Sequence, residues 1–438
     1  MATDRDRAPA NPANAGRPPS VDALARSLAG VGLPSAICVD IAREAIAAGE
    51  PQSAETRARA FRRTLLMPVV NATGVLLHTN LGRAPVGTHQ PERSSNVELD
   101  LRTGERGSRQ RAVGQLLAKL CGAEAAMVVN NNAAAVMLVL AALAFDRGVA
   151  VSRGESVEIG GAFRVPDVME QSGATLVDVG TTNRTRLADY AAAVERGRGA
   201  GGSAIALTMK VHPSNFRVEG FVESTSVAEL ATLDVPVVAD IGSGLIDANC
   251  PWLSGPPPAW LAGEPGARQN LEAGAALVTF SGDKLFGGPQ AGIIAGRRDL
   301  VDRCSRHPLA RALRPGGMVL TSLQATALAY LDRTVTRDVA FWRMVATPLD
   351  VLQARASALC SSTSGASHEP ASAMPGAGSA PGATMPSVAV VIDGDHLAHF
   401  RDRPTPIIAR VRDGRTFLDL RSVDPDDDSH LHAALAAR

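Results

Sequence analysis

Residues 277–292 read Leu277-Val-Thr-Phe-Ser-Gly-Asp-Lys-Leu-Phe-Gly-Gly-Pro-Gln-Ala-Gly292, an apolar strand followed by Asp283, Lys284 and several glycines. A lysine at a strand end is suited to a Schiff base with pyridoxal phosphate (PLP) when small residues let the ring approach the backbone. Ser281 can hydrogen-bond a phosphate group in the same place. A tight turn with an exposed lysine is the alternative interpretation of this stretch taken alone.

A second informative segment, 127–135, reads as strand, polar turn and helix, with Asn130, Asn131 and Asn132 in the turn. The backbone N–H groups and the positive end of the helix would meet where a phosphate could dock. These asparagines are therefore candidate cofactor ligands. An ordinary asparagine cap on a buried helix is the alternative.

A third segment, 235–244, reads as a buried strand that ends at Asp240. A carboxylate there can pair with a protonated pyridine nitrogen, whereas a turn-capping aspartate is the alternative. Asn215 lies between the asparagine turn and Asp240. This order of parts resembles fold-type I PLP enzymes, in which an asparagine or a neighbour contacts the ring 3-oxygen, the aspartate the ring nitrogen and the lysine the aldehyde carbon.

The chain from 67 to 345 alternates short apolar runs with helical patterns, which predicts an α/β domain with a mostly parallel sheet. The runs lie at 126–129, 150–151, 176–179, 205–207, 235–240, 275–280 and 293–294. We expect this domain to carry the PLP site.

Two smaller domains are predicted around it. Residues 1–18 are expected to form a disordered tail, and 19–66 two or three short helices. Residues 346–438 are expected to form an α+β domain with a flexible linker at 356–386, because that stretch is rich in Ala, Ser, Gly and Pro. A strand at 387–392, a hairpin around Asp413 and Gly414 and a terminal helix at 430–437 complete it.

Composition excludes several classes of protein. The chain has 438 residues, 45% hydrophobic and 20% charged, which is typical of globular domains and not of disordered or fibrous ones. Its longest apolar run, 133–145, is too short to span a bilayer, and the first twenty residues lack the apolar segment of a secretory signal. Five scattered cysteines and no HExxH spacing argue against a metal site and favour a reducing, cytoplasmic location.

The charged residues narrow the candidate partners and binding sites further. The net charge is zero, so no global case for nucleic acid exists. The only lysines are Lys119, Lys210 and Lys284, against 41 arginines. Arg83 in a glycine-containing loop and Arg311 with Arg314 on one helix face are candidate anion ligands, with surface salt bridges as the alternative. Four arginines lie at the end of the first small domain, and they form either a solvated helix face or a phosphate-contacting patch. They are Arg57, Arg59, Arg62 and Arg63.

Together these stretches make the chain similar to the bacterial selenocysteine synthase family, the L-seryl-tRNA(Sec) selenium transferases. The similarity covers roughly 20–430, in family order. The stretches that carry it are NATGVLLHTNLGRAP, SNVELDLRTGERGSR, GAEAAMVVNNNAAAV, SRGESVEIGGAFRVPDVMEQSGATLVDVGTTNRT, KVHPSNFRVEGF, DIGSGL, VTFSGDKLFGGPQAGII, HPLARALR and FLDLRSVDPDDD.

The resemblance implies an aspartate aminotransferase-like fold, PLP as cofactor and a homodecamer. It also implies conversion of seryl-tRNA(Sec) to selenocysteinyl-tRNA(Sec) through elimination to aminoacrylyl-tRNA and addition of selenium from selenophosphate. Lys284 matches the Schiff-base lysine, with Asp283 as its catalytic neighbour. Arg83, Arg311 and Arg314 match the residues that hold the selenium donor. The domain at 19–66 would bind the tRNA.

Three segments differ from the family pattern: 86–93, 110–112 and 315–317. Two other functions therefore stay open. One is a related PLP-dependent lyase acting on a small amino acid or a phosphorylated amino-sugar acid, which would need Lys284 and Asp240 but not the N-terminal domain. The other is a tRNA-binding protein without catalysis.

Overall fold

The computed structural model describes residues 19–87, 92–159, 163–198, 204–216, 218–376 and 378–438. The predicted tail at 1–18 and part of the segment 86–93 lie outside these ranges. The chain divides into two compact units, 1–69 and 70–438, which are described separately below.

The first unit is helical. It consists of α1 (Val21–Ser27), α2 (Ser35–Ala47) and α3 (Ala54–Arg62) with two short 3₁₀ turns. The Ser20 hydroxyl caps α1 by accepting a hydrogen bond from the Ala23 N–H at 3.2 Å. Apolar side chains from all three helices meet in one small core, which includes Leu28, Ile41 and Ala58.

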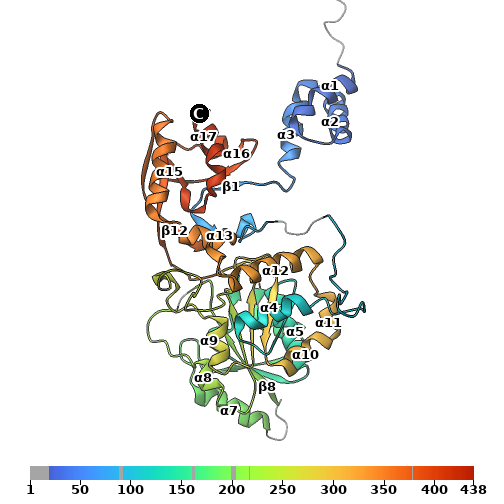
Figure 1. The fold of residues 1–438 in the computed structure, drawn as a ribbon, viewed down its shortest axis with the longest axis vertical. Coiled ribbons are helices and arrows are strands. Elements are labelled where there is room, and N and C mark those ends of the chain that lie inside the picture. Colours follow the sequence, from blue (N-terminus) through green and yellow to red (C-terminus); the bar gives the residue numbers. More distant parts are fainter. Residues whose placement is uncertain (1–18, 88–91, 160–162, 199–203, 217, 377) are drawn as a thin grey trace, which may run out of the picture. The chain divides into compact units, whose positions relative to one another are not determined.

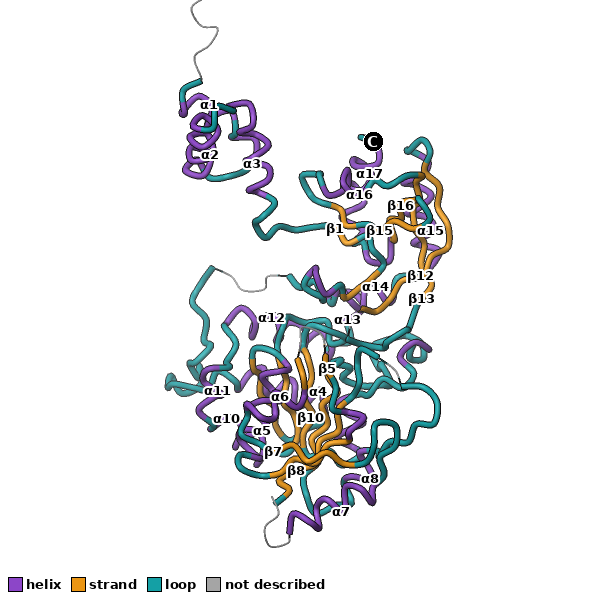
Figure 2. Tube along the Cα trace, turned by 180° about the vertical axis from the view of Figure 1, so that it is seen from behind, coloured by secondary structure: helices purple, strands orange, loops and turns teal. Residues whose placement is uncertain are grey.

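The second unit contains, among its described residues, a seven-stranded sheet in the order β3-β11-β10-β9-β8-β4-β7 (Figures 1 and 2). Only β11 runs antiparallel to its neighbours. The strands are β3 (Ala125–Val129), β4 (Gly148–Ser152), β7 (Thr175–Val179), β8 (Ile205–Val211), β9 (Val237–Gly242), β10 (Leu277–Ser281) and β11 (Gly292–Gly296). Each predicted apolar run overlaps one of these strands, so the predicted mostly parallel α/β fold is confirmed.

Helices cover both faces of this sheet, because alternate strand residues point to opposite sides. Val128 belongs to one apolar core and Val129 to the other. The first core includes α4 (Arg111–Cys121), α7 (Leu187–Arg198), α8 (Val227–Leu230), α9 (Ala267–Glu272) and α12 (Gly317–Leu331). The second includes α5 (Asn132–Ala144), α6 (Val165–Gln171) and α10 (Arg298–Arg306). The remaining elements are α11 (Pro308–Ala312), α13 (Val335–Asp338), α14 (Ala340–Ala346) and the hairpin of β5 (Glu158–Ile159) with β6 (Phe163–Arg164).

Edge strand β3 is partly covered by a side chain. The Gln110 amide donates to the Val128 carbonyl at 2.8 Å and accepts from the Val128 N–H at 2.9 Å. This amide therefore pairs with β3 as a neighbouring strand would. Gln110 belongs to one of the segments that differ from the family pattern.

A second sheet contains five strands among the described residues, in the order β15-β16-β13-β12-β2. They are β2 (Val75–Leu77), β12 (Ala366–Gly376), β13 (Met385–Asp393), β15 (Arg410–Arg412) and β16 (Arg415–Asp419), and β1 (Val70–Asn71) pairs separately with β14 (Ile407–Ile408). The helices packed here are α15 (Leu349–Ser361), α16 (Leu397–Arg401) and α17 (Asp428–Ala436). The predicted hairpin and terminal helix correspond to β15 with β16 and to α17.

The prediction of a flexible linker at 356–386 is wrong. The segment contains the end of α15, all of β12 and the start of β13. Strand β12 pairs antiparallel with β13 over eight residues, from Ala366 opposite Ile392 to Ala373 opposite Met385. The alanines and serines of β12 form a strand because β13 offers a regular, apolar partner.

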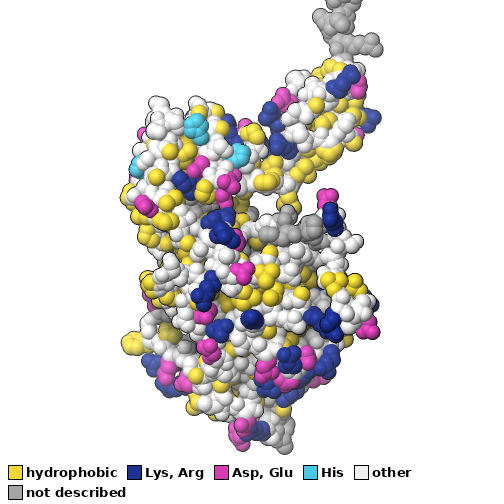
Figure 3. Space-filling model, in the orientation of Figure 1, with side chains coloured by type: hydrophobic (Ala, Val, Ile, Leu, Met, Phe, Trp, Pro, Cys, Tyr) yellow, Lys and Arg dark blue, Asp and Glu magenta, His cyan; other side chains and the backbone are white. Residues whose placement is uncertain are grey.

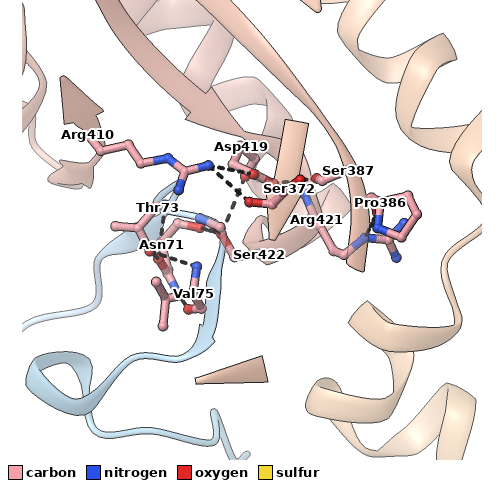
Figure 4. A network of polar contacts seen from close by, with 11 residues as sticks. Asn71, Thr73, Val75, Ser372, Pro386, Ser387, Arg410, Asp419, Arg421 and Ser422 are labelled. Carbon is pink, nitrogen blue, oxygen red and sulfur yellow. Dashed lines mark hydrogen bonds and ion pairs between the residues drawn. The ribbon is translucent and has the colours of Figure 1, made fainter. Parts of the chain in front are cut away.

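A polar network joins the second sheet to residues 71–75 (Figure 4). The buried Asp419 carboxylate accepts from Ser387 at 2.5 Å and from Arg410 at 3.1 Å. The Ser422 hydroxyl donates to the Asn71 carbonyl at 2.8 Å. Arg421 is also buried and donates to main-chain carbonyls, including that of Pro386 at 2.7 Å. The network fixes the chain just before β2.

Candidate active site

Lys284 lies directly beyond β10, in a turn closed by the Gly287 N–H donating to the Lys284 carbonyl at 2.8 Å. All three lysines fall within the described residues, and only Lys284 is buried, at 6% exposure. Lys210 pairs with Glu155 at 2.5 Å, and Lys119 is exposed. The structure therefore favours the buried-lysine interpretation over an exposed turn.

The surroundings of Lys284 lower the pKa of its amine. Burial is the main cause, and the positive charge of Arg83 acts in the same direction. The negative charges of Asp240, Asp283 and Glu264 oppose this effect without cancelling it. A buried lysine whose amine is easily deprotonated can act as a nucleophile or a base.

Asp240 lies near the end of β9, beside Lys284. Its Oδ1 accepts hydrogen bonds from Asn132 Nδ2 at 2.8 Å and from Thr279 Oγ1 at 2.9 Å. Thr279 is its register partner in β10. Burial raises the pKa of Asp240, although both hydrogen bonds favour the ionised form. Asn132 and Asp240, predicted separately, are thus in direct contact.

The other members of the asparagine turn have different surroundings. Asn131 caps α5, with its Oδ1 accepting from the Ala134 N–H at 2.8 Å. Asn130 is exposed, and its N–H donates to the Leu313 carbonyl. Ser281 is buried at the end of β10. The capping role considered for this turn therefore applies to Asn131.

Asn215 is exposed in the structure and donates to the Glu158 carbonyl at 3.4 Å. The structure does not bring it into hydrogen-bond contact with Asp240 or Lys284. His212, three residues earlier, lies directly after β8, and its N–H donates to the Asp240 carbonyl at 2.9 Å. The contact predicted for Asn215 with the ring oxygen stays a prediction.

Sequence reasoning missed the pair of His212 and Glu264. His212 Nε2 lies 3.4 Å from Glu264 Oε1, and Glu264 is 6% exposed. Burial alone would raise the pKa of Glu264, but His212, Ser243 and the Ala380 N–H outweigh it and lower that pKa. Both side chains line a cavity of about 610 Å³ together with Asp240. In the sequence, the one signal that could have indicated this pair was a histidine at the end of a predicted strand.

Arg83 and Asp283 form an ion pair, with 2.6 Å between Nη1 and Oδ2. Asp283 is 4% exposed and directly precedes Lys284. Arg83 has a φ of 62°, which a non-glycine residue rarely adopts. This left-handed backbone turns the chain after β2 toward Asp283.

Arg311 and Arg314 lie elsewhere, in a groove of about 880 Å³ beside edge strand β3. Basic and acidic side chains gather over α10 and α11 on the face seen in Figure 3. Arg314 Nη1 lies 3.5 Å from Glu98, which also pairs with Arg106 and Arg109. Arg83 is absent from the described lining of this groove, which therefore contains two of the three predicted donor ligands.

The arginines of the first unit are partly paired. Arg57 lies 3.2 Å from Glu50, and Arg59 lies 2.7 Å from Glu55. Arg62 and Arg63 follow at the end of α3. This supports a solvated helix face for Arg57 and Arg59 and leaves the binding of RNA by this unit as a prediction.

The residues around Lys284 fit PLP. Within the described residues, Asn132 Oδ1 and Ser214 Oγ are buried without a hydrogen-bond partner. Buried polar atoms are almost always paired, and these two belong to a side chain in contact with Asp240 and to one near Gly242 at the end of β9, which fits a polar ligand there. In the same described part of the chain, no helix is long and apolar enough to cross a membrane, and no cluster of three metal-binding side chains occurs.

Comparisons with known proteins agree with this geometry. Residues 69–424 match the family described as L-seryl-tRNA selenium transferase. The chain is 43% identical over 407 residues to the L-seryl-tRNA(Sec) selenium transferase of Moorella thermoacetica, covering 87% of this chain and 83% of that protein. The Serratia proteamaculans enzyme of the same name is 43% identical over 405 residues, covering 86% and 84%.

Among solved structures, D-glucosaminate-6-phosphate ammonia-lyase shares the fold. Its TM-score is 0.56 at 20% identity, covering 86% of this chain and 97% of that one. A similarity at this level of identity concerns the fold alone.

Proposed function

The chain belongs to the L-seryl-tRNA selenium transferase family, and on that premise we propose that it converts seryl-tRNA(Sec) to selenocysteinyl-tRNA(Sec) at the site around Lys284. The observation that carries the proposal is the buried Lys284 beside the hydrogen-bonded pair of Asp240 and Asn132. This arrangement stands in a chain 43% identical to enzymes of that name over most of its length.

The enzyme uses PLP. Lys284 would hold the aldehyde carbon, Asp240 the ring nitrogen, and the turn at 130–132 with Ser281 the phosphate. When bound, PLP withdraws electrons from the carbon that carries the substrate's amine. Asn132 and Thr279 keep Asp240 in place for its partner, because both donate to the same carboxylate oxygen.

Lys284 serves as the base in this proposal. Its lowered pKa favours the neutral amine, which can take the proton from the serine Cα. The departing serine hydroxyl gains a proton and leaves as water. The selenium of selenophosphate then adds to Cβ while Lys284 returns a proton to Cα. Water cleaves the bond between selenium and phosphorus, and inorganic phosphate leaves. Asp283, held by Arg83, stays fixed beside the amine throughout.

Selenophosphate is the proposed selenium donor, held by Arg83, Arg311 and Arg314. Guanidinium groups suit a phosphate-like anion because they can donate two parallel hydrogen bonds. Arg311 and Arg314 line one groove while Arg83 pairs with Asp283, so we propose that a second subunit completes the donor site, in line with the homodecamer that the resemblance implies. The unit at 19–66, with Arg57, Arg59, Arg62 and Arg63, is proposed to bind the tRNA.

The test is a reconstituted reaction. Purified protein with PLP, seryl-tRNA(Sec) and selenophosphate should yield tRNA-bound selenocysteine, and Lys284→Ala should abolish it. Borohydride reduction should fix the cofactor on the peptide of Lys284 and not on those of Lys119 or Lys210. Unchanged serine together with a normal cofactor absorbance would contradict the proposal, as would full turnover by Lys284→Ala.

A further inference from the structure

Two neighbouring strands of the second sheet lead into the Lys284 site. β2 and β12 run parallel, with Leu77 paired to Gly376. Since parallel strands end at the same edge of a sheet, the segments that follow them leave side by side. The segment after β2 brings Arg83 to Asp283, and the segment after β12 brings residues 378–380 to Lys284.

Gly378 contacts the Lys284 side chain directly. A Cβ atom built on Gly378 would lie 2.8 Å from Lys284 Nζ, closer than real Cβ contacts come, and 3.1 Å from Cε, so the end of the lysine side chain would have to shift. Gly378 also has a φ of 80°, which favours glycine. Gly382 in the same segment has a similar φ of 73°, but a Cβ there would meet nothing within 4 Å.

The segment is also anchored by a buried carboxylate, that of Glu264. The Ala380 N–H donates to Glu264 Oε2 at 3.0 Å, while Glu264 Oε1 faces His212. Ala380 is buried with a φ of 44°, a backbone conformation that persists only where the surroundings hold it. Glu264 thus ties the segment to the end of β8 at the edge where Asp240 lies.

We propose that residues 378–380, anchored by Glu264, form a positioning element for Lys284. Because Gly378 has no side chain, its backbone leaves the space in which the Lys284 amine moves when a substrate amine takes its place. Gly378 and Glu264 are positioning residues, since both act through Lys284. The inference rests on the proposed function only in assigning PLP to Lys284.

The first experiment compares Gly378→Ala with Gly382→Ala in the full chain. Both add one methyl group at a left-handed glycine, but only the first meets Lys284. Cofactor-free protein is mixed with PLP, and the covalent adduct on Lys284 is followed by absorbance and by borohydride trapping. Gly378→Ala should slow adduct formation by about tenfold or more, and Gly382→Ala should stay within about twofold of wild type. Equal rates for the two variants would overturn the proposal.

A second pair of variants tests the anchor without adding bulk near Lys284. Glu264→Gln keeps an oxygen that can accept from the Ala380 N–H, whereas Glu264→Ala does not. Adduct formation should slow by about threefold or more in Glu264→Ala and remain closer to wild type in Glu264→Gln. Wild-type rates in Glu264→Ala would contradict the anchoring role, even if Gly378→Ala failed to fold.

These readouts are independent of selenium transfer. If wild-type protein forms the Lys284 adduct but leaves seryl-tRNA unchanged, the proposed function fails while the positioning role is still tested. If Gly378→Ala matches Gly382→Ala and selenium transfer proceeds, the positioning role fails alone.

Discussion

The Arg83 guanidinium donates to the Asp283 carboxylate across 2.6 Å, one residue before Lys284. Arg83 comes from the loop after β2 in the second sheet, whereas Asp283 and Lys284 follow β10 in the first. This contact places a fixed positive charge beside a buried amine, and it gives the first prediction.

Arg83→Gln should raise the pKa of Lys284. Burial and the Arg83 charge both lower that pKa, and the variant removes the second cause while Asp240, Asp283 and Glu264 remain. The neutral amine then forms only at higher pH, so the acid limb of Cα-proton exchange in seryl-tRNA should move up by about half to one pH unit. Exchange into deuterated water without a selenium donor measures it. Arg83→Lys keeps the positive charge and should leave the acid limb near its wild-type pH. If the acid limbs of the two variants fell at the same pH, the effect of the Arg83 charge on Lys284 would be refuted.

Asp240→Asn should stabilise the protein without cofactor, and it should reduce selenium transfer by the protein with cofactor. Burial raises the pKa of Asp240, so the folded protein holds a proton on this carboxyl more tightly than the unfolded chain does. The stabilisation from that proton is complete below the ordinary carboxyl pKa and is lost as pH rises through the raised value. The variant should therefore increase the free energy of unfolding near pH 8 by about 1–3 kcal/mol, with little change near pH 4. Selenium transfer should fall by about 100-fold or more.

Urea unfolding at the two pH values gives the Asp240→Asn comparison. Asp234→Asn, at an exposed residue, is the control and should change neither stability nor activity. A variant of Asp240 that is less stable than wild type at pH 8 would show that the burial argument is wrong.

Arg311→Ala and Arg314→Ala should each weaken the selenium donor's binding. Loss of a charged hydrogen bond to an anion corresponds to about a 10–100-fold rise in KM for selenophosphate. The KM for seryl-tRNA should stay unchanged, because in this proposal Arg311 and Arg314 contact the donor and not the seryl-tRNA. Arg306→Ala, an exposed residue paired with Asp302, is the matched control. An equal rise in both KM values would argue for an RNA-binding groove.

Arg421→Ala should destabilise the larger unit. Arg421 is 5% exposed and donates to the carbonyls of Pro386, Met344 and Thr347 at 2.7–3.0 Å. Removing it leaves one buried and two part-buried main-chain acceptors without that donor, so the free energy of unfolding should fall by about 2–4 kcal/mol. Arg412→Ala, with an exposed side chain, should change it by less than about 0.5 kcal/mol. Urea midpoints measure both, and similar losses in both variants would disprove the role of the network.

The sequence predicted the sheet and its lysine well, because each strand of a parallel sheet is a continuous apolar run that can be recognised locally. Lys284 and Asp240 were found for the same reason, since each follows such a run. Asn132 was found because a polar turn between strand and helix has a characteristic pattern.

The contacts that were missed depend on the three-dimensional arrangement. His212 and Glu264 share no motif and meet only when β8 and the loop before α9 are assembled. Strand β12 has few apolar residues, so its structure comes from pairing with β13. The approach of Gly378 to Lys284 follows from that pairing and could not be read from composition, which indicated a flexible linker instead.

The pairing of β2 with β12 has a consequence for synthesis. One strand is made early and the other only after most of the chain has left the ribosome. The surroundings of Lys284 are incomplete until β12 and Gly378 have emerged and β12 has paired with β2, although the seven strands of the first sheet are already complete. A nascent chain should therefore acquire its cofactor late, and a chain that ends before residue 366 should carry the lysine but lack part of its enclosure.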